Sequence, residues 1–528
     1  MKRKITALFL SVALVLGMTA CGTNNGNNAA SGSAQTEAGT EQNAENTIYY
    51  GTNDYVRINP AMDEHGEINA LIFDGLTDHD GNDQVIPRLA KSWDYDDETY
   101  TYTFRLEEGV TWHDGEPFTA EDVKFTIEAI MDPANDSENA PNYEDVEEIN
   151  VVDDHTVTFR LKAPNAAFLD YMTMPILPKH LLEGEDMQTS DFFRKPIGTG
   201  PYKLDSWEDG QAIVLKKNED YFAGPAHIET IVFKIVADDN AKALQLQSGE
   251  LNLSQVTPKD AQNFKNNADY NVYTMKTSDY RGIMYNFAND YWKENADLIP
   301  GINYAIDRQA IINAVLLGHG EIAYGPLQRN VYNDEDVEHY DFDLSKSTEV
   351  FEAAGCTKDA DGYWCRNGKR IGFTINASSS DQVRIDMAQI AAQQLQEAGL
   401  DVKAAVPAGG IDWENQECCI IGWGSPFDAD DHTYKVFGTG KGANYSSYSN
   451  QIVDEALTKA RETDDSAERA AYYAEFQTEL AKTPAYTFFC YIDAMYVADS
   501  HISGINPDVV LGHHGVGIFW NVCDWTIE

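Results

Sequence analysis

Stretches with the periodicity of a strand and stretches with the periodicity of a helix alternate along the chain from residue 47 onward. Residues 99–106 (TYTYTFRL) and 155–161 (HTVTFRL) alternate in the manner of strands. Residues 380–398 carry apolar side chains at helical spacing, and Gly399 directly after them is typical of a helix C-terminus. Continued over about 480 residues, this alternation predicts an α/β fold.

Shorter patterns predict further elements. Thr119 is a good N-cap residue and Asp122 follows it by three positions, so a helix is expected to begin at residue 119. Residues 400–406 predict a strand, and residues 450–481 predict two helices. The turn-rich segment 356–365 predicts a hairpin.

The N-terminus has the pattern of an export signal. It begins with Met-Lys-Arg-Lys and continues with an apolar run over residues 5–16, which is too short for a transmembrane helix. Residues 18–21 (MTAC) resemble the lipobox of bacterial lipoproteins, in which the chain is cut before the cysteine and the cysteine is lipidated. We therefore predict a signal peptide over residues 1–20 and a lipid on Cys21 that holds the protein to the outer face of the cell membrane. An ordinary cleaved signal is the alternative.

The segment after this cysteine is polar. Residues 22–46 contain no Val, Ile, Leu or aromatic residue. Such a segment cannot bury enough apolar surface to offset the entropy that ordering costs. We therefore expect residues 21–46 to form a disordered tether and the folded body to begin near residue 47. No segment of the body reaches about 18 consecutive apolar residues, so the body is expected to be soluble.

The formal net charge of −48 limits the partners of the chain. A negative surface repels nucleic acid and anionic membranes, so neither is expected to be bound. The charge mildly favours a cationic or zwitterionic solute. Solubility and repulsion between crowded surface proteins are the simpler explanation of the same charge.

Six cysteines remain for the body after Cys21: Cys356, Cys365, Cys418, Cys419, Cys490 and Cys523. Export permits disulfides, but the sequence alone does not give their pairing. Cys356 and Cys365 flank the predicted hairpin and could cross-link it. There is no CxxC pair and no zinc-ligand spacing, and no cofactor is expected.

Five motifs follow one another along the body. The longest is FRLEEGVTWHDGEPFTAEDV at residues 104–123. The others are LIFDGL at 71–76 with IPRLAKSW at 86–93, PIGTGPY at 196–202, NEDYF at 218–222, and Gly422-Trp423 followed by Asp428. In sequence and order they resemble the family 5 solute-binding proteins of ABC importers, which include dipeptide, oligopeptide and nickel binders. The resemblance covers residues 47–528, and the turn residues of these motifs are expected to shape the fold rather than to touch a ligand.

The resemblance implies a two-lobed periplasmic-binding-protein fold of type 2, cluster C, with two crossover strands. The expected first lobe is 47–277 plus 492–528, with 77–190 as an extra subdomain, and the expected second lobe is 278–491. A solute would then lie in the cleft between the lobes, and closure would need contacts that exist only in the closed form. Separate permease and ATPase chains of the importer are the expected partners, and the protein itself is expected to be a monomer.

The resemblance leaves the solute open. In peptide binders an Asp after the motif tryptophan pairs with the solute amine, but Ser425 stands at that position here. The run WGSPFDAD is nearer to the nickel-binding branch, in which Trp423 and Phe427 would line the pocket, but the arginine expected in that branch is Glu107. We predict a peptide or peptide-like solute, with nickel or another metal chelate as the alternative, and place Trp423, Phe427 and Ser425 at the site.

Loop residues and the first crossover supply further candidates. His65, His513 and His514 lie in segments that reach the cleft in the family and could bind a chelate or a carboxylate; ordinary loop histidines are the alternative. Tyr280 and Arg281 lie near the first crossover. Arg281 could bind a solute carboxylate or form a structural salt bridge.

An enzyme is the rival class of protein. The sequence contains no GxSxG, HExxH or P-loop motif. Asp359-Ala-Asp-Gly begins like a calcium loop but lacks the closing Glu, so we interpret it as a hairpin turn. Asp428 and Asp430 are expected to cap the following helix. We therefore predict a binding protein, with a secreted hydrolase as the least favoured reading.

Overall fold

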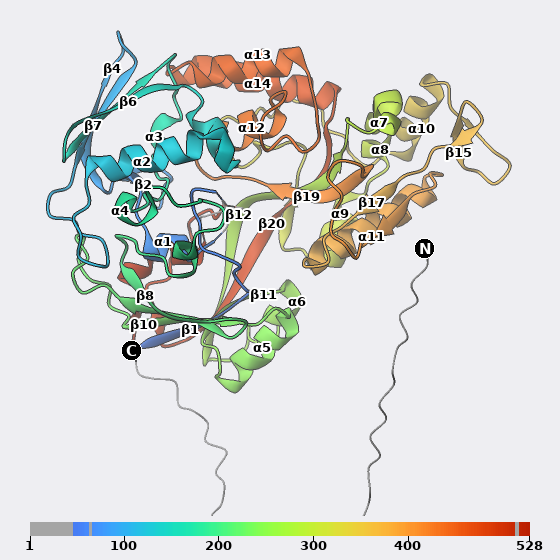
Figure 1. Ribbon diagram of the computed structural model, residues 1–528. Helices are drawn as coiled ribbons and strands as arrows, with labels where there is room; N and C mark the ends of the chain where they lie inside the picture. Colours follow the sequence, from blue (N-terminus) through green and yellow to red (C-terminus); the bar gives the residue numbers. More distant parts are fainter. Residues whose placement is uncertain (1–45, 63–65, 513–516) are drawn as a thin grey trace, which may run out of the picture. The chain divides into compact units, whose positions relative to one another are not determined.

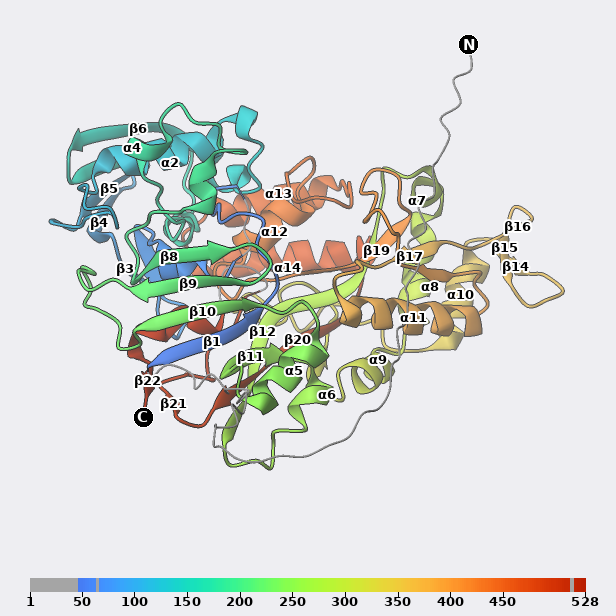
Figure 2. The same cartoon turned by 60° about the horizontal axis from the view of Figure 1, so that its bottom comes forward.

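An eleven-stranded mixed sheet runs through the body of the protein (Figure 1). The computed structural model describes residues 46–62, 66–512 and 517–528. The strands of this sheet are β1 (Thr47–Thr52), β8 (Tyr202–Glu208), β9 (Ala212–Lys217), β10 (Thr230–Ile235), β11 (Leu253–Val256), β12 (Tyr270–Tyr285), β13 (Gly320–Ile322), β17 (Thr374–Asn376), β18 (Lys403–Ala405), β19 (Cys418–Trp423) and β20 (Tyr486–Asp499). Their order is β18-β17-β19-β12-β20-β11-β1-β10-β9-β8, and β13 pairs with β20. Figure 2 shows β8, β9, β10 and β1 in this order at one end.

Two long strands, β12 and β20, lie at the centre of this sheet and pair antiparallel along most of their length. Residues 280–285 of β12 also pair with β19, and residues 495–498 of β20 pair with β11. The register between β12 and β20 shifts between Lys276 and Tyr280, which is the mark of a β-bulge. The two expected crossovers between the lobes, at residues 277–278 and 491–492, fall within β12 and β20.

The buried apolar side chains divide into two sets. Among the described residues, one set comes only from 48–275 and 494–525, and we call it the first core. The other set comes only from 280–491, and we call it the second core. Both cores include residues of β12 and β20. The predicted α/β architecture is therefore confirmed, with two centres of packing joined by one sheet.

A separate four-stranded antiparallel sheet belongs to the first core. In sheet order its strands are β4 (Ala90–Asp96), β5 (Thr101–Leu106), β7 (Thr156–Leu161) and β6 (Val146–Asp153). β5 and β7 are the two strands that alternating side chains predicted, and they pair with each other. Helix α2 (Ala120–Met131) buries Val123, Ile127 and Ile130 in the first core, and Thr119 and Asp122 form the predicted capping box at its start.

The helices confirm most of the local predictions. The segments predicted to be helical form α11 (Gln382–Glu397), α13 (Gln451–Arg461) and α14 (Ser466–Lys482). Gly399 has φ +97°, a left-handed conformation that suits glycine after a helix. The strand predicted over 400–406 is shorter, because β18 meets its partner β17 only at residues 403–405.

The remaining described elements are short. The helices are α1 (Asn69–Ile72), α3 (Phe168–Tyr171), α4 (Lys179–Leu182), α5 (Asp239–Ser248), α6 (Pro258–Ala261), α7 (Asp290–Asn295), α8 (Ile299–Tyr304), α9 (Arg308–Val315), α10 (Leu344–Ala353) and α12 (Asp430–Phe437). The strands are β2 (Thr77–His79), β3 (Val85–Pro87), β14 (Thr357–Lys358), β15 (Trp364–Arg366), β16 (Lys369–Arg370), β21 (Ile502–Ser503) and β22 (Thr526–Ile527).

The two most specific motifs meet through His113. Its Nδ1 accepts the backbone N–H of Gly198 at 3.2 Å, and its Nε2 donates to the Gly200 carbonyl at 3.0 Å. Burial lowers the pKa of His113 to about 4, so the ring is neutral at pH 7. A Cβ on Gly198 would lie 1.8 Å from the Ile72 carbonyl oxygen, so this position requires glycine. These residues shape the fold, as predicted.

The cysteines correct one expectation. Cys356, Cys365, Cys418, Cys419, Cys490 and Cys523 are all free thiols. The possible Cys356–Cys365 cross-link is therefore not formed, although the predicted hairpin is present as the antiparallel pair β14–β15. Cys356 packs into the second core instead.

Across the described part of the chain, no helix has the length and apolarity needed to cross a membrane.

Candidate functional site

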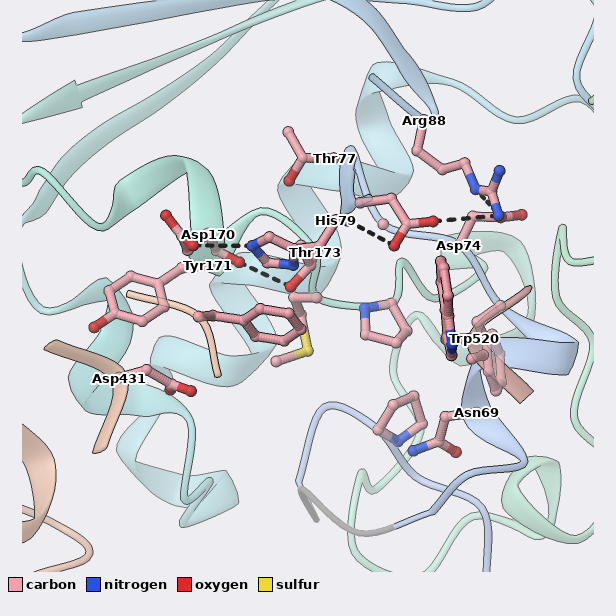
Figure 3. A pocket seen from close by; sticks show the side chains of 18 of the residues that line it. Asn69, Asp74, Thr77, His79, Arg88, Asp170, Tyr171, Thr173, Asp431 and Trp520 are labelled. Atoms are coloured by element: carbon pink, nitrogen blue, oxygen red, sulfur yellow. Dashed lines mark hydrogen bonds and ion pairs between the residues drawn. The ribbon is translucent and has the colours of Figure 1, made fainter. Parts of the chain in front are cut away.

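A cavity of about 250 Å³ lies where the two cores meet (Figure 3). Most of its wall comes from three first-core segments, within residues 60–88, 139–175 and 509–520. The second core supplies a short segment at the start of α12, with the lining residues Phe427, Asp431, His432 and Lys435. The first-core wall includes Glu67, Asn69, Phe73, Asp74, Thr77, Asp78, His79, Asp80, Asp83, Arg88, Asp170, Tyr171, Thr173, Phe519 and Trp520.

The wall is acidic. Seven carboxylates line the cavity against two cationic side chains, Arg88 and Lys435. Each cation is already paired, because Arg88 Nε lies 3.1 Å from Asp74 Oδ1 and Lys435 Nζ lies 3.2 Å from Asp431 Oδ1. Burial raises the pKa of Asp83 to about 6, so this carboxylate is ionised at pH 7. The unbalanced charge that faces the cavity is therefore negative.

Asp74 forms the anchor of the first-core wall. Its carboxylate accepts hydrogen bonds from Thr199 Oγ1 at 2.9 Å and from the Tyr221 hydroxyl at 2.8 Å, besides its ion pair with Arg88. Figure 3 shows Arg88 reaching across to Asp74. Burial raises the pKa of Asp74, and Arg88 opposes that effect. The charge of Arg88 is therefore already paired with Asp74.

Glu67 is a second, half-buried acid of this wall. The hydroxyls of Tyr50 and Tyr496 donate to its two carboxylate oxygens at 2.6 and 3.0 Å. Burial raises the pKa of Glu67, while these hydrogen bonds lower it. The two tyrosines therefore fix the orientation of the carboxylate.

An aromatic contact joins the two cores at the cavity. The ring of Phe427 stacks on the ring of His79 with centroids 3.6 Å apart and planes at 9°. His79 Nε2 lies 2.9 Å from Asp170 Oδ1, an interaction drawn in Figure 3. Asp170 therefore fixes the plane of the His79 ring, against which the second core rests.

The second-core wall is held by the half-buried carboxylate of Asp431. Asp431 pairs with Lys435 and lies 3.1 Å from His432 Nδ1. Burial alone would raise the pKa of Asp431, but Lys435, His432 and a hydrogen bond from Ser425 lower it to about 2. Asp431 is therefore ionised throughout the physiological range and can hold the start of α12 in place. Within the residues that the structure describes, no group of three His, Cys, Asp or Glu side chains is arranged to hold a metal ion.

The predicted site residues separate into two groups. Phe427 lines the cavity, and Trp423 and Ser425 stand directly behind its wall. Trp423 packs edge-to-face on His432 at 5.8 Å, and Ser425 bonds Asp431.

The crossover candidates lie elsewhere. Tyr280 is 0% exposed and packs on Phe488 inside the second core, and Arg281 is 7% exposed and pairs with Asp279. Neither belongs to the cavity wall that the structure describes. His65, His513 and His514 lie outside the described residues.

The acids and the histidine of the first-core wall were not predicted from the sequence. Asp74 carried a signal, because an acid inside the apolar run LIFDGL is costly to bury without a purpose. His79, Asp170 and Trp520 carried none, since they come from separate segments that only the tertiary fold brings together. Asp428 accepts the N–H of Asp430 at the start of α12, as predicted, and also binds Arg469 through both oxygens at 2.7 Å. Asp430 does not cap this helix as expected, because its carboxylate binds Arg461 and Tyr171 instead.

Comparison with known proteins places this chain in a family. The model of the bacterial extracellular solute-binding proteins, family 5 (middle region), matches residues 84–452. Protein XP55 of Streptomyces lividans is 32% identical over 511 residues, which cover 94% of this chain and 92% of that protein.

Solved structures agree with this assignment. NikZ from Campylobacter jejuni in complex with Ni(L-His) matches with a TM-score of 0.87 and 35% identity, over 92% of this chain and 100% of that one. The oligopeptide-binding protein AppA from Bacillus subtilis, in complex with a nonapeptide, matches with a TM-score of 0.82 and 26% identity, over 91% of this chain and 99% of that one. The two-lobed fold is thereby confirmed. The chain belongs to family 5 of the bacterial extracellular solute-binding proteins, which are extracytoplasmic binders of ABC importers and not enzymes.

Proposed function

We propose that this protein captures a short peptide or peptide-like solute that carries a positive charge, and delivers it to an ABC importer. The observation that supports this proposal is the acidic cavity. Its wall comes from both cores, and its two cations are already paired with wall carboxylates. A protonated α-amine is the group that such a wall favours most, because unlike charges attract strongly where water is partly excluded.

The volume of the cavity supports a small solute. Pockets for drug-sized ligands measure about 300–1,000 Å³, and this cavity measures about 250 Å³. A dipeptide or tripeptide is therefore a better match than a long peptide such as the nonapeptide held by AppA of Bacillus subtilis.

A metal chelate is the second candidate. NikZ from Campylobacter jejuni, which is 35% identical to this chain, was solved with Ni(L-His). His65, His513 and His514 are the imidazoles that we propose for such a ligand. Glu67, two residues after His65, and Gly517, three residues after His514, line the cavity. Replacing all three histidines by alanine should abolish binding of Ni²⁺ with L-histidine and leave binding of a dipeptide unchanged.

Calorimetric titration with three probes tests these candidates. Ala-Ala should bind and raise the melting temperature, because a ligand that binds only the folded state stabilises it, by about 2.7 kcal/mol at a hundred times Kd. N-acetyl-Ala-Ala should bind far more weakly, since it lacks the positive charge. Equal binding of both dipeptides would contradict the role of the acidic wall, and binding of Ni²⁺ with L-histidine alone would establish the second candidate.

The organisation around the cavity is also a proposal. We assign residues 47–277 and 492–528 to the first lobe, with 77–190 as its extra subdomain, and 278–491 to the second; the division of the buried side chains supports these limits. We further propose a monomer tethered to the membrane by residues 21–46 and a lipid on Cys21, after removal of residues 1–20. Cys21→Ala should release the protein from the membrane fraction of its cells.

A further inference from the structure

A polar cluster with a buried centre joins the two cores at a second place, beside the cavity. Its second-core members are Asp430, Tyr434, Lys441 and Arg461, and its first-core members are Glu144, Asp145 and Tyr171. We call it the Arg461 cluster. Apart from Tyr171, none of these residues lines the cavity.

The centre of the cluster is a buried ion pair. Arg461 is 2% exposed and Asp430 is 0% exposed. The Nε and Nη2 atoms of Arg461 donate to Asp430 Oδ2 at 3.0 and 2.5 Å. Two charges buried this deeply need further hydrogen-bond partners, and the first core supplies them.

The partners of the ion pair cross from one core to the other. The Tyr171 hydroxyl donates to Asp430, and Arg461 Nη1 donates to the Pro141 carbonyl at 3.3 Å. The main chain also takes part, because the Ala166 N–H donates to the Arg461 carbonyl at 2.9 Å. Separation of the two cores would break all three bonds and leave the groups to water.

The edge of the cluster repeats this cross-core arrangement. Lys441 Nζ lies 2.7 and 2.8 Å from the two oxygens of Glu144, and the Tyr434 hydroxyl donates to Glu144 at 2.5 Å. The guanidinium of Arg461 lies over the Tyr434 ring at 3.5 Å. None of these contacts involves a solute.

Helix α12 connects the cluster to the cavity. Asp430, its first residue, turns into the cluster, while Asp431 and Lys435 form the second-core wall of the cavity. A shift of Asp430 away from Tyr171 would therefore move the wall as well.

We propose that Arg461 is a positioning residue for solute capture: it holds α12 against the first core and favours the closed form without a solute. Contacts present only in the closed form shift the equilibrium toward it, whether the protein or a ligand supplies them. The inference rests on capture of a solute in this cavity, but it does not depend on which solute is captured.

Hydrogen exchange of the full chain, measured without any solute, tests this proposal. Arg461→Met should speed exchange of residues 138–145 and 166–175 by about tenfold, because these first-core segments lose their cover when the cores part. Arg308→Met is the matched control: Arg308 is also buried, but it binds the Phe488 and Tyr340 carbonyls inside the second core. The control should speed exchange near residue 308 and leave the two first-core segments at the wild-type rate.

A charge exchange decides the question where the arginine variant does not fold. Glu144→Lys should speed exchange of both first-core segments, and adding Lys441→Glu should restore most of the protection by re-forming the pair in reverse. A hydrogen-exchange rate in Arg461→Met equal to that of the wild type would overturn the proposal. Where the arginine variant does not fold, a wild-type rate in Glu144→Lys would overturn it. A double variant with both charges reversed that regains no protection would overturn it as well. Since no solute is present, a failed search for the solute would affect only the proposed function.

Discussion

The two cores meet at the cavity and at the Arg461 cluster, and the two meeting places differ in how they treat charge. At the cavity, carboxylates outnumber cations and about 250 Å³ stays open. At the cluster, Arg461 and Asp430 are buried and bonded from both cores. The cavity has room for a solute, whereas the Arg461 cluster consists of the protein's own side chains. The same helix, α12, takes part in both, so under the two proposals the affinity for a solute and the closure of the protein depend on adjacent residues.

The strongest way to break this contrast is to remove the charge at the centre of the cluster. Arg461→Met should lower the free energy of unfolding by about 3–5 kcal/mol, because Asp430 is left as an uncompensated buried carboxylate. Urea denaturation followed by tryptophan fluorescence measures this loss.

The control removes both charges. Arg461→Met with Asp430→Leu should recover much of the stability, since an apolar pair costs no desolvation. A loss under about 1 kcal/mol in the single variant is the size expected of an exposed pair, and it would show that water reaches the cluster.

The second test acts on the cavity side. Trp423→Ala with Phe427→Ala should weaken solute binding about a hundredfold, or about 2.7 kcal/mol, because the second-core wall loses the Phe427 ring and the Trp423 ring that supports His432 from behind. Calorimetry well below the melting temperature measures the affinity. Trp413→Ala, which removes an exposed tryptophan of the same half of the chain, is the control and should bind as the wild type does. Undiminished affinity in the double variant would mean that the solute binds elsewhere.

A pH titration tests the contribution of one carboxylate of the cavity wall, Asp83. Because burial raises the pKa of Asp83 to about 6, this carboxylate is neutral at pH 5 and charged at pH 7. A dipeptide amine stays protonated over that range, so affinity should rise about fivefold from pH 5 to pH 7. Asp83→Asn should flatten the profile, and an unchanged profile in that variant would assign the rise to another group.

The same shift makes a prediction about stability. The unfolded chain releases the Asp83 proton near pH 4, whereas the folded protein keeps it until about pH 6. The contribution of Asp83 to stability is therefore greatest at low pH and falls as the pH rises between these values. Asp83→Asn should remove this slope from melting temperatures measured over the same window.

The smallest effect is expected at the edge of the cluster. Glu144→Gln should cost about 0.5 kcal/mol, because the Glu144 side chain is 34% exposed and pairs across water-accessible surface. Denaturation in low and in high salt measures the loss, which should shrink as the ion pair is screened. A loss as large as that of Arg461→Met would show that the edge is as dry as the centre.

Most of the fold could be predicted because its signals are local. Alternation in residues 101–106 and 156–161 and the Thr119–Asp122 capping box are written within a few neighbouring positions. The end of β18 and the state of the cysteines could not be predicted in the same way. Both depend on partners that are distant in sequence, such as β17 beside β18.

The site was predicted less completely, for a related reason. Phe427 follows a recognisable motif, but its partner His79 lies almost 350 residues earlier, at the end of the short strand β2, where the sequence has no distinctive pattern. Tyr280 and Arg281 look in sequence like binding residues, yet a buried tyrosine and a paired arginine have the same sequence signature. Only the tertiary structure separates these cases.

The bulge between Lys276 and Tyr280 has a mechanical consequence. Three residues of β12 stand there opposite one residue of β20. Extra residues on one strand increase the local twist and bend the ribbon at that point. The irregularity lies between the stretch of β12 that packs with the first core and the stretch that packs with the second. We therefore expect bending to concentrate there, while the ladder bonds on either side stay intact. A few backbone torsions would then set how far the two halves of the protein open. The side chains that contact the solute would not affect that distance.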